Sequence, residues 1–293
     1  MNRDPHISGV LWSPAHCLDN DRDFGMREEA ILEEAAVSIV IHGAVYGVMM
    51  LTPHDLEDFV TGFLWTEDVL RSPADILACE RESGAEGEAL YLQLRAEAAE
   101  RAKARHRCLP GASACGLCGV PDFRGLQPFP PIRDDRRISC TAIAQALKHL
   151  CAEQRLNHHT GTAHAACLCT EDAAIVREDI GRHNAVDKAI GAALRQGWRS
   201  GQARLLTVSS RLSFEIAQKA LSFGIPTVVA VSGISSLAIQ LAQNCGLTVI
   251  GYARNGRLTV YANAWRLAQS DSRPKDPDTG TPSVLEMPRC AGG

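Results

Sequence analysis

Hydrophobic positions along the chain follow two patterns, and the pattern changes near the middle. Before residue 95, apolar positions at three- and four-residue spacing predict one helix, with Thr52 as its N-cap and Pro53 in its first turn. Four strands are predicted around it, each a β-branched or apolar run between turn signals: residues 38–43, 45–51, 76–83 and 89–95. This order predicts a small sheet covered by a helix.

After Ser139 the pattern alternates between strands and helices. Asn184 is expected to cap the second helix. The predicted helices cover residues 141–153, 184–197, 213–224 and 235–246. The predicted strands cover residues 164–169, 173–179, 205–210, 227–232, 247–253 and 258–264. Such alternation indicates a mostly parallel, layered sheet, so the predicted fold class is α/β with a smaller α+β unit before it.

Between and around these parts the pattern breaks down. Residues 1–26 are expected to form a polar arm, and residues 96–138 are the least regular stretch. The predicted organisation is a small domain at 27–107, a mobile loop and linker at 108–138, an α/β domain at 139–268 and a disordered tail at 269–293, which is rich in Pro, Gly and Ser.

Composition narrows the class of protein. The net charge of −4 over 293 residues gives no broad basic footprint, so no nucleic-acid partner is expected. No apolar run is long enough to cross a bilayer, and the N-terminus lacks the apolar core of a secretory signal. Eleven cysteines without an export signal favour a reducing compartment, and a cytoplasmic location is expected.

The first candidate for chemistry is the pair Cys115 and Cys118, in a segment made almost entirely of Gly, Ala, Ser, Cys and Pro. Two thiols at this spacing can approach each other, and a cysteine pKa below its free value of about 8.5 raises the thiolate fraction. A thiolate can accept a sulfane sulfur and hold it as a persulfide. The pair fits four interpretations: a sulfur carrier, half of a zinc site, a thiol–disulfide pair or a structural pair.

A zinc site needs two more ligands, and His164, Cys167 and Cys169 are the candidates. They lie on a predicted strand, where alternate residues point to opposite faces. Cys167 and Cys169 are therefore expected to share a core-facing side, with His164 pointing away. No metal site is predicted.

Charged and small polar residues follow several predicted strands at the point where each strand ends. A glycine turn before a helix favours anion binding at Arg182 and His183. Ser209–Ser213 and Ser232–Ser236 occupy the same position after later strands, and Arg254-Asn255-Gly256-Arg257 predicts a hairpin turn with two guanidinium groups. Ligands of open α/β sheets lie at such strand ends, so together these loops indicate a phosphate-bearing nucleotide or cofactor.

These motifs resemble one family, the formate dehydrogenase accessory sulfurtransferases (FdhD). The resemblance covers residues 28–266 in order and is most specific in the run from Arg177 to Lys188. The other shared motifs are Ser113–Gly119, Thr160–Ala166, Ser213–Ala220 and the Gly251–Tyr261 hairpin.

The resemblance implies a β-grasp-like N-terminal unit, a cytidine-deaminase-like C-terminal domain and a sulfurtransferase activity. Sulfur would pass from a cysteine desulfurase to a molybdenum (or tungsten) bis-molybdopterin guanine dinucleotide cofactor of formate dehydrogenase, with a homodimer as the expected assembly. The persulfide cysteine falls on Cys115, with Cys118 as its partner thiol. The implied cofactor-binding residues are Tyr252, Ala253, Arg254, Asn255, Gly256 and Arg257, with His183 and Arg211 beside them.

The chain departs from the family pattern at two positions. Ser210 and Thr162 stand where the family has glycine, so each loses backbone freedom in a loop. Deaminase chemistry is not expected, because the zinc deaminase signature is absent from the sequence. Two other functions remain open: a cofactor chaperone that moves no sulfur, and a zinc-bound structural module.

Overall fold

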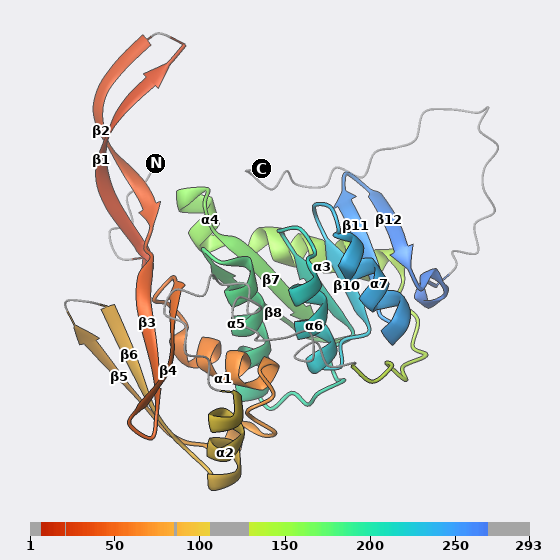
Figure 1. Cartoon of the computed structure of the whole chain (residues 1–293). Helices are drawn as coiled ribbons and strands as arrows, with labels where there is room; N and C mark the ends of the chain where they lie inside the picture. The colour runs from red at the N-terminus through yellow and green to blue at the C-terminus, as the bar shows by residue number, and fades with distance from the viewer. Residues whose placement is uncertain (1–6, 21, 85–86, 106–128, 269–293) are drawn as a thin grey trace, which may run out of the picture.

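The protein is described by a computed structural model over residues 7–20, 22–84, 87–105 and 129–268 (Figure 1). Within this part of the chain the structure is a mixed α/β fold with a four-stranded sheet, a six-stranded sheet and a two-stranded hairpin. The predicted α/β class is therefore confirmed. No helix of the described part combines the length and apolar character that crossing a membrane would require.

The four-stranded sheet has the strand order β4-β3-β6-β5. Its strands are β3 (Ala35–Ile41), β4 (Ala44–Leu51), β5 (Ile76–Gly84) and β6 (Gly87–Leu94), and a 3-10 turn, η1 (Pro73–Asp75), precedes β5. The predicted hairpin is confirmed, because β3 and β4 pair antiparallel. Helices α1 (Leu56–Thr66) and α2 (Ala96–Arg105) share one buried apolar core with this sheet.

The six-stranded sheet has the order β12-β11-β10-β9-β7-β8. Its strands are β7 (His164–Cys169), β8 (Ala174–Asp179), β9 (Leu205–Val208), β10 (Thr227–Ala230), β11 (Thr248–Arg254) and β12 (Arg257–Ala262), followed by the 3-10 turn η3 (Ala264–Arg266). β9, β10 and β11 are parallel, whereas β7 runs antiparallel to both of its neighbours. The carboxyl ends of β8 to β11 and the start of β7 therefore lie at one edge of the sheet.

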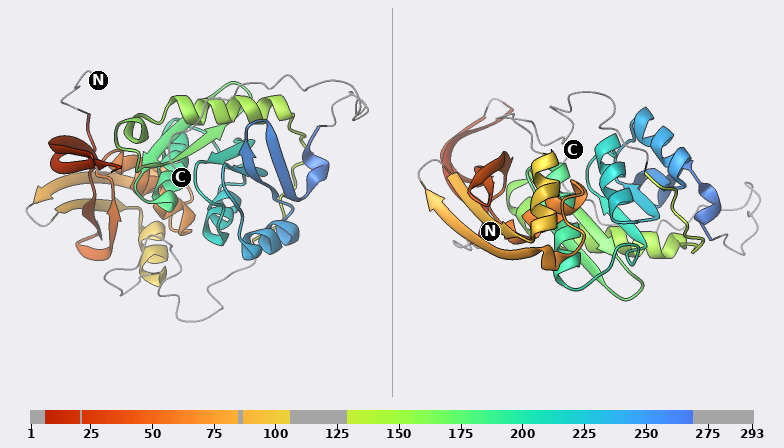
Figure 2. Two further views of the ribbon diagram at one scale, coloured as in Figure 1. Left: turned by 90° about the horizontal axis from the view of Figure 1, so that it is seen from above. Right: turned by 60° about the horizontal axis from the view of Figure 1, so that its bottom comes forward.

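Helices cover both faces of this sheet (Figure 2, left). One face packs against α5 (Arg182–Arg195), α6 (Phe214–Ser222) and α7 (Ser236–Cys245). The other packs against α3 (Cys140–Ala152), and the short helix α4 (Arg155–Thr160) follows. The result is a three-layer arrangement, in which buried positions alternate between the two faces along each strand.

The structure corrects two predictions about regular elements. The segment predicted as a polar arm contains a hairpin of β1 (Val10–Asp19) and β2 (Arg22–Leu32) that projects from the rest of the molecule (Figure 1). Residues 96–105, expected to be irregular, form α2, which buries Ala98, Ala99 and Ala102 on one face. In that stretch small alanines replace large apolar residues, so the hydrophobic signal is weak although the helix propensity is high.

Two predicted helix starts are also wrong. The first helix begins at Leu56 rather than after Thr52, and Asp55 precedes it in the left-handed region. The second begins at Arg182 with Gly181 at its N-cap, so Asn184 lies inside the helix. Thr52 and Asn184 are instead fully buried, and both make long-range hydrogen bonds. Thr52 and Asn184, which the sequence predicted to cap helices, therefore bond to distant parts of the chain instead.

Helices α1 and α5 join the two sheets through a contact that only glycine permits. A Cβ atom at Gly62 would lie 1.8 Å from the backbone oxygen of Asp187, and one at Gly191 would lie 1.8 Å from that of Asp58. The two backbones therefore touch directly, which fixes the distance between the small sheet with its helices and the larger α/β part.

Gly62→Ala is expected to destabilise the protein by more than about 3 kcal/mol, because the new methyl group forces the two helix backbones apart. Gly47→Ala is the matched control, since nothing lies within 4 Å of a Cβ at Gly47. Urea unfolding of both variants measures the difference. Equal midpoints for Gly62→Ala and Gly47→Ala would contradict the contact.

Candidate functional site

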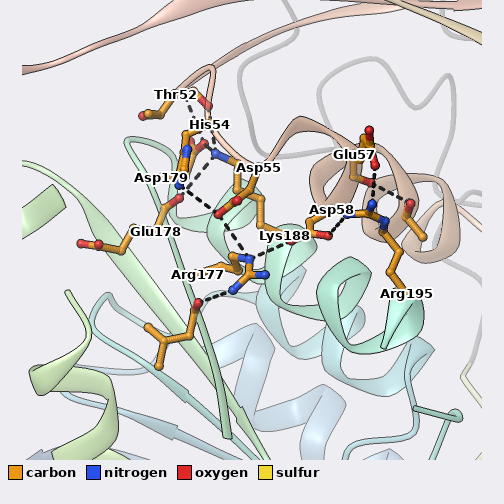
Figure 3. Close-up of polar contacts among 12 residues, drawn as sticks. Thr52, His54, Asp55, Glu57, Asp58, Arg177, Glu178, Asp179, Lys188 and Arg195 are labelled. Carbon is orange, nitrogen blue, oxygen red and sulfur yellow. Dashed lines mark hydrogen bonds and ion pairs between the residues drawn. The ribbon is translucent and has the colours of Figure 1, made fainter. Parts of the chain in front are cut away.

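The run Arg177–Lys188 is divided between two places in the molecule. Half of it builds a buried contact with the segment between β4 and α1 (Figure 3). Asp179 and Lys188 are both fully buried, and the Lys188 ammonium lies 2.7 Å from Asp179 Oδ2. The same oxygen accepts the Thr52 N–H at 3.1 Å, and Lys188 donates to the Thr52 carbonyl oxygen at 2.9 Å. A charge pair buried this deeply needs these extra hydrogen bonds.

The second oxygen of Asp179 is also satisfied. It accepts the Gly181 N–H at 2.7 Å and the Asn184 side-chain amide at 3.0 Å, and that amide donates to the Met50 carbonyl oxygen as well. Asp179 therefore ties the end of β8 to the start of α5 and to the end of β4. Its carboxylate is engaged in structure and is not free to bind a ligand.

A second set of ion pairs lies around Asp58 on α1 (Figure 3). Its carboxylate is bound by Arg177 Nε at 2.8 Å and by Arg195 at 2.6 Å, while Arg195 also contacts Glu57. Arg177 reaches Asp55 at 3.3 Å too. Arg177 is thus a structural residue.

Two other residues of the run, Arg182 and His183, lie at the edge of the six-stranded sheet where β8 to β11 end. Backbone hydrogen bonds connect the loops at this edge one to the next. Ser209 exchanges two hydrogen bonds with Ala165, at 2.9 and 3.0 Å. Leu212 bonds Gly233 at 3.0 Å, and Tyr252 N–H donates to Ser232 at 2.9 Å. The sequence placed these loops at strand ends, and the structure brings them together as one continuous rim.

The β11–β12 hairpin carries the predicted cofactor-binding segment at the far end of this rim. Asn255 and Gly256 have φ of 53° and 73°, the pair of positive values that a tight hairpin turn requires. Arg254 and Arg257 pair across the turn and are exposed, whereas Ala253 is buried in the core.

Tyr252 lies at a bulge in β11 with a φ of 51°. Tyr252 is 43% exposed, and a Cβ atom at Gly233 would lie 3.0 Å from its hydroxyl oxygen. Gly233 therefore leaves the space in which the phenol rests, and the bulge turns the tyrosine toward the rim.

His183 is buried at the start of α5. Its Nε2 lies 3.3 Å from the Ser213 hydroxyl and 3.8 Å from Glu215, both at the start of α6. This histidine therefore connects two helix starts at the rim, and only a small part of its surface is open to a ligand.

One rim residue, His164, was missed by the sequence assignment of binding residues, whereas Arg182 was predicted. His164, at the start of β7, pairs in register with Asp179, and Arg182 begins α5 beside it. Burial lowers the pKa of His164, and the nearby positive charges of Arg182 and Arg211 lower it further, against the effect of Asp179. Arg182 Nε is buried and has no hydrogen-bond partner among the residues that the structure describes. The glycine turn before Arg182 was the signal that predicted it.

The rim arginines differ from the structural ones in having no acidic partner. Within the described ranges, Arg182 and Arg211 make no ion pair, and neither do Arg254 and Arg257. No cluster of three or more His, Cys, Asp or Glu side chains in those ranges could hold a metal ion. The rim therefore offers guanidinium groups suited to phosphate oxygens.

Cys115 and Cys118 lie outside the described residues. Cys167 and Cys169 share the core-facing side of β7, as predicted, with their sulfur atoms 3.5 Å apart. Their hydrogen bond and their burial raise the pKa of the Cys167 thiol well above its usual range. A buried, protonated thiol is a poor zinc ligand.

The two departures from the family pattern cause no backbone strain. Neither Ser210 nor Thr162 has a positive φ. The Ser210 hydroxyl donates to the Arg211 carbonyl oxygen at 3.0 Å, and Thr162 bonds Thr160 in the same way at 2.9 Å. Glycine is therefore not required at either position in this chain.

Fold and rim together define a mixed α/β protein with a basic strand-end site. The chain belongs to the FdhD/NarQ family, whose model matches residues 32–268. Curated relatives named "Sulfur carrier protein FdhD" include one from Variovorax paradoxus, 37% identical over 80% of this chain and 85% of its own, and one from Cupriavidus necator, 36% identical over 83% and 85%.

A solved structure supports the fold. The crystal structure described as a formate dehydrogenase accessory protein from Desulfotalea psychrophila aligns with a TM-score of 0.70 at 22% identity. The alignment covers 88% of this chain and 99% of the other.

His164 is expected to make folding stability depend on pH. Its folded pKa lies below its unfolded value of about 6.5, so the unfolded chain takes up the proton first as the pH falls. Stability is therefore lost as the pH drops from about 7.5 toward the folded pKa. Urea unfolding at several pH values should show a smaller acid loss in His164→Gln than in the parent chain. An equal loss in both proteins would contradict the assignment.

Proposed function

We propose that the protein is a sulfur carrier that serves formate dehydrogenase. Sulfur is held as a persulfide on Cys115 and delivered to a molybdenum bis-molybdopterin guanine dinucleotide cofactor lying on the rim. The family match carries this proposal, because it spans both the cysteine pair and the rim in one alignment. The names of the relatives and of the solved structure agree with it.

Loading is a thiol exchange. The Cys115 thiolate attacks the terminal sulfur of a cysteine desulfurase persulfide, the sulfur–sulfur bond breaks, and the donor leaves as a thiolate. Cys115 then carries the sulfane sulfur as a persulfide.

Release requires two electrons, because a metal ligand has the oxidation level of sulfide. Attack of the Cys118 thiolate on the Cys115 sulfur would form a Cys115–Cys118 disulfide and expel hydrosulfide, so that atoms and electrons balance. An external thiol reductant would then restore both thiols. This step gives Cys118 a role that a single cysteine could not fill.

The protein's contribution to acceptance of the sulfur is binding and orientation. Arg254 and Arg257 have the planar donors that bind phosphate oxygens in pairs, and they are exposed with no acid to compete within the described chain. Tyr252 offers a flat, half-exposed ring beside them that a guanine base could stack on. These features support a dinucleotide as the ligand.

Cys115→Ala is expected to abolish sulfur loading and to leave formate dehydrogenase present, cofactor-loaded and inactive. After incubation with a cysteine desulfurase and cysteine, intact mass spectrometry should find one added sulfur of about 32 Da in the parent chain and none in Cys115→Ala. Cys245→Ala, at a buried core thiol, is the control and should load normally.

A cofactor chaperone that moves no sulfur is the second candidate. The rim favours it, because cofactor binding by the rim arginines needs no cysteine. It predicts full formate dehydrogenase activity with Cys115→Ala and loss of activity with Arg254→Met and Arg257→Met. That pattern would refute the carrier role.

A further inference from the structure

Two thiols lie side by side in the core on the α3 side of the six-stranded sheet. Cys167 and Cys169 alternate along β7, and their sulfur atoms are 3.5 Å apart. β7 pairs with β8 along one edge and with β9 along the other, so the backbone holds both cysteines in place. The proposed function uses neither thiol.

Cys169 forms part of the wall of a large cavity. The cavity has a volume of about 1290 Å³ and lies between α3, the turn after β7, and β8; we call it the α3 cavity. Around Cys169 it is lined by Ala142, Ala146, Thr170 and Leu205, among others. Cys167 is fully buried and does not line it. A small reagent in the α3 cavity therefore meets Cys169 first.

The two thiols differ in acidity. Cys167 is the more deeply buried, so it keeps its proton and donates the S–H to the Cys169 sulfur. This hydrogen bond lowers the pKa of Cys169, against the effect of burial, whereas the bond and burial together raise the pKa of Cys167. Because the thiolate is the nucleophile, Cys169 is the thiol that reacts first.

The geometry of the strand allows a bond between the two sulfur atoms. Two residues along a strand span about 6.6 Å, and disulfides join Cα atoms up to about 6.8 Å apart. A Cys167–Cys169 disulfide is therefore possible but lies near the limit of the allowed range. Disulfides under such strain are reopened readily by thiol reductants.

We propose that Cys167 and Cys169 form a peroxide-sensitive dithiol, which closes reversibly to a disulfide when a peroxide enters the α3 cavity. The Cys169 thiolate attacks one oxygen of hydrogen peroxide, the oxygen–oxygen bond breaks, hydroxide leaves, and Cys169 becomes a sulfenic acid. The Cys167 sulfur then attacks the Cys169 sulfur and expels water. Two thiols and one peroxide thus give one disulfide and two waters. The inference goes beyond the proposed function, because it requires neither Cys115 nor the rim.

Peroxide treatment of the full reduced chain, followed by peptide mass spectrometry, tests the pair. Remaining thiols are blocked with N-ethylmaleimide in denaturant, and trypsin then releases residues 156–177, which contain these two cysteines and no other. The expected peptide is about 2 Da lighter than the reduced one and carries no maleimide. Dithiothreitol added before blocking should restore a peptide with two maleimides. Cys245 is the control: burial raises the pKa of this single core thiol, so it should be lost at least about tenfold more slowly.

Two variants separate the roles of the thiols. Cys169→Ala should leave Cys167 unmodified, because the remaining thiol is buried and protonated. Cys167→Ala should stop at a sulfenic acid on Cys169, which dimedone traps. The parent measurement decides the proposal even if a variant fails to fold. Two maleimides on the parent peptide, at a peroxide concentration that oxidises the exposed Cys140, would overturn it. So would oxidation of Cys167 in Cys169→Ala at the parent rate.

Discussion

The ion pair between Asp179 and Lys188 is the interaction on which the rest of the structure depends. Both side chains are fully buried, and together they bond the end of β8, the start of α5 and the turn after β4. Removing one partner of such a pair costs about 3–5 kcal/mol, because the other charge stays buried without compensation. The glycine contact between α1 and α5 lies on the same helix, where Gly191 follows Lys188 by three residues.

This arrangement links the joint between the two sheets to the basic rim. Asp179 accepts a hydrogen bond from Thr52, next to the small sheet, whereas Arg182 and His183, three and four residues later, lie at the rim. The position of the rim's first helix start is therefore set by a contact with a distant part of the chain. Residues close in the sequence therefore serve two purposes: Asp179 joins the two sheets, and Arg182 and His183 belong to the rim.

Most of the fold could be predicted from the sequence because it depends on local pattern. The alternation of strands and helices after Ser139 gave nearly every element, and the Asn255-Gly256 turn was correctly placed. Helix starts were harder to predict: Thr52 and Asn184 have capping side chains, but their partners are more than 100 residues away. The β1–β2 hairpin was missed because apolar and polar residues do not alternate regularly along it.

The site was predictable in part for the same reason. Strand-end loops and the hairpin arginines are visible as short motifs, whereas the separation of Arg177 from Arg182 is not. Both are arginines in one short motif, yet one is paired with Asp58 and the other has no acid within the described residues. Only the tertiary structure shows which charge is satisfied, and unsatisfied charge is what identifies a binding group.

Hydrogen–deuterium exchange of Lys188→Met tests the central role of the buried pair most directly, with the exposed Lys148→Met on α3 as control. Loss of the pair is predicted to raise amide exchange in the turn at residues 50–55 and in the first turn of α5 together, while β9 and β10 stay protected. Unchanged protection in both regions, or a rise confined to one of them, would contradict the account.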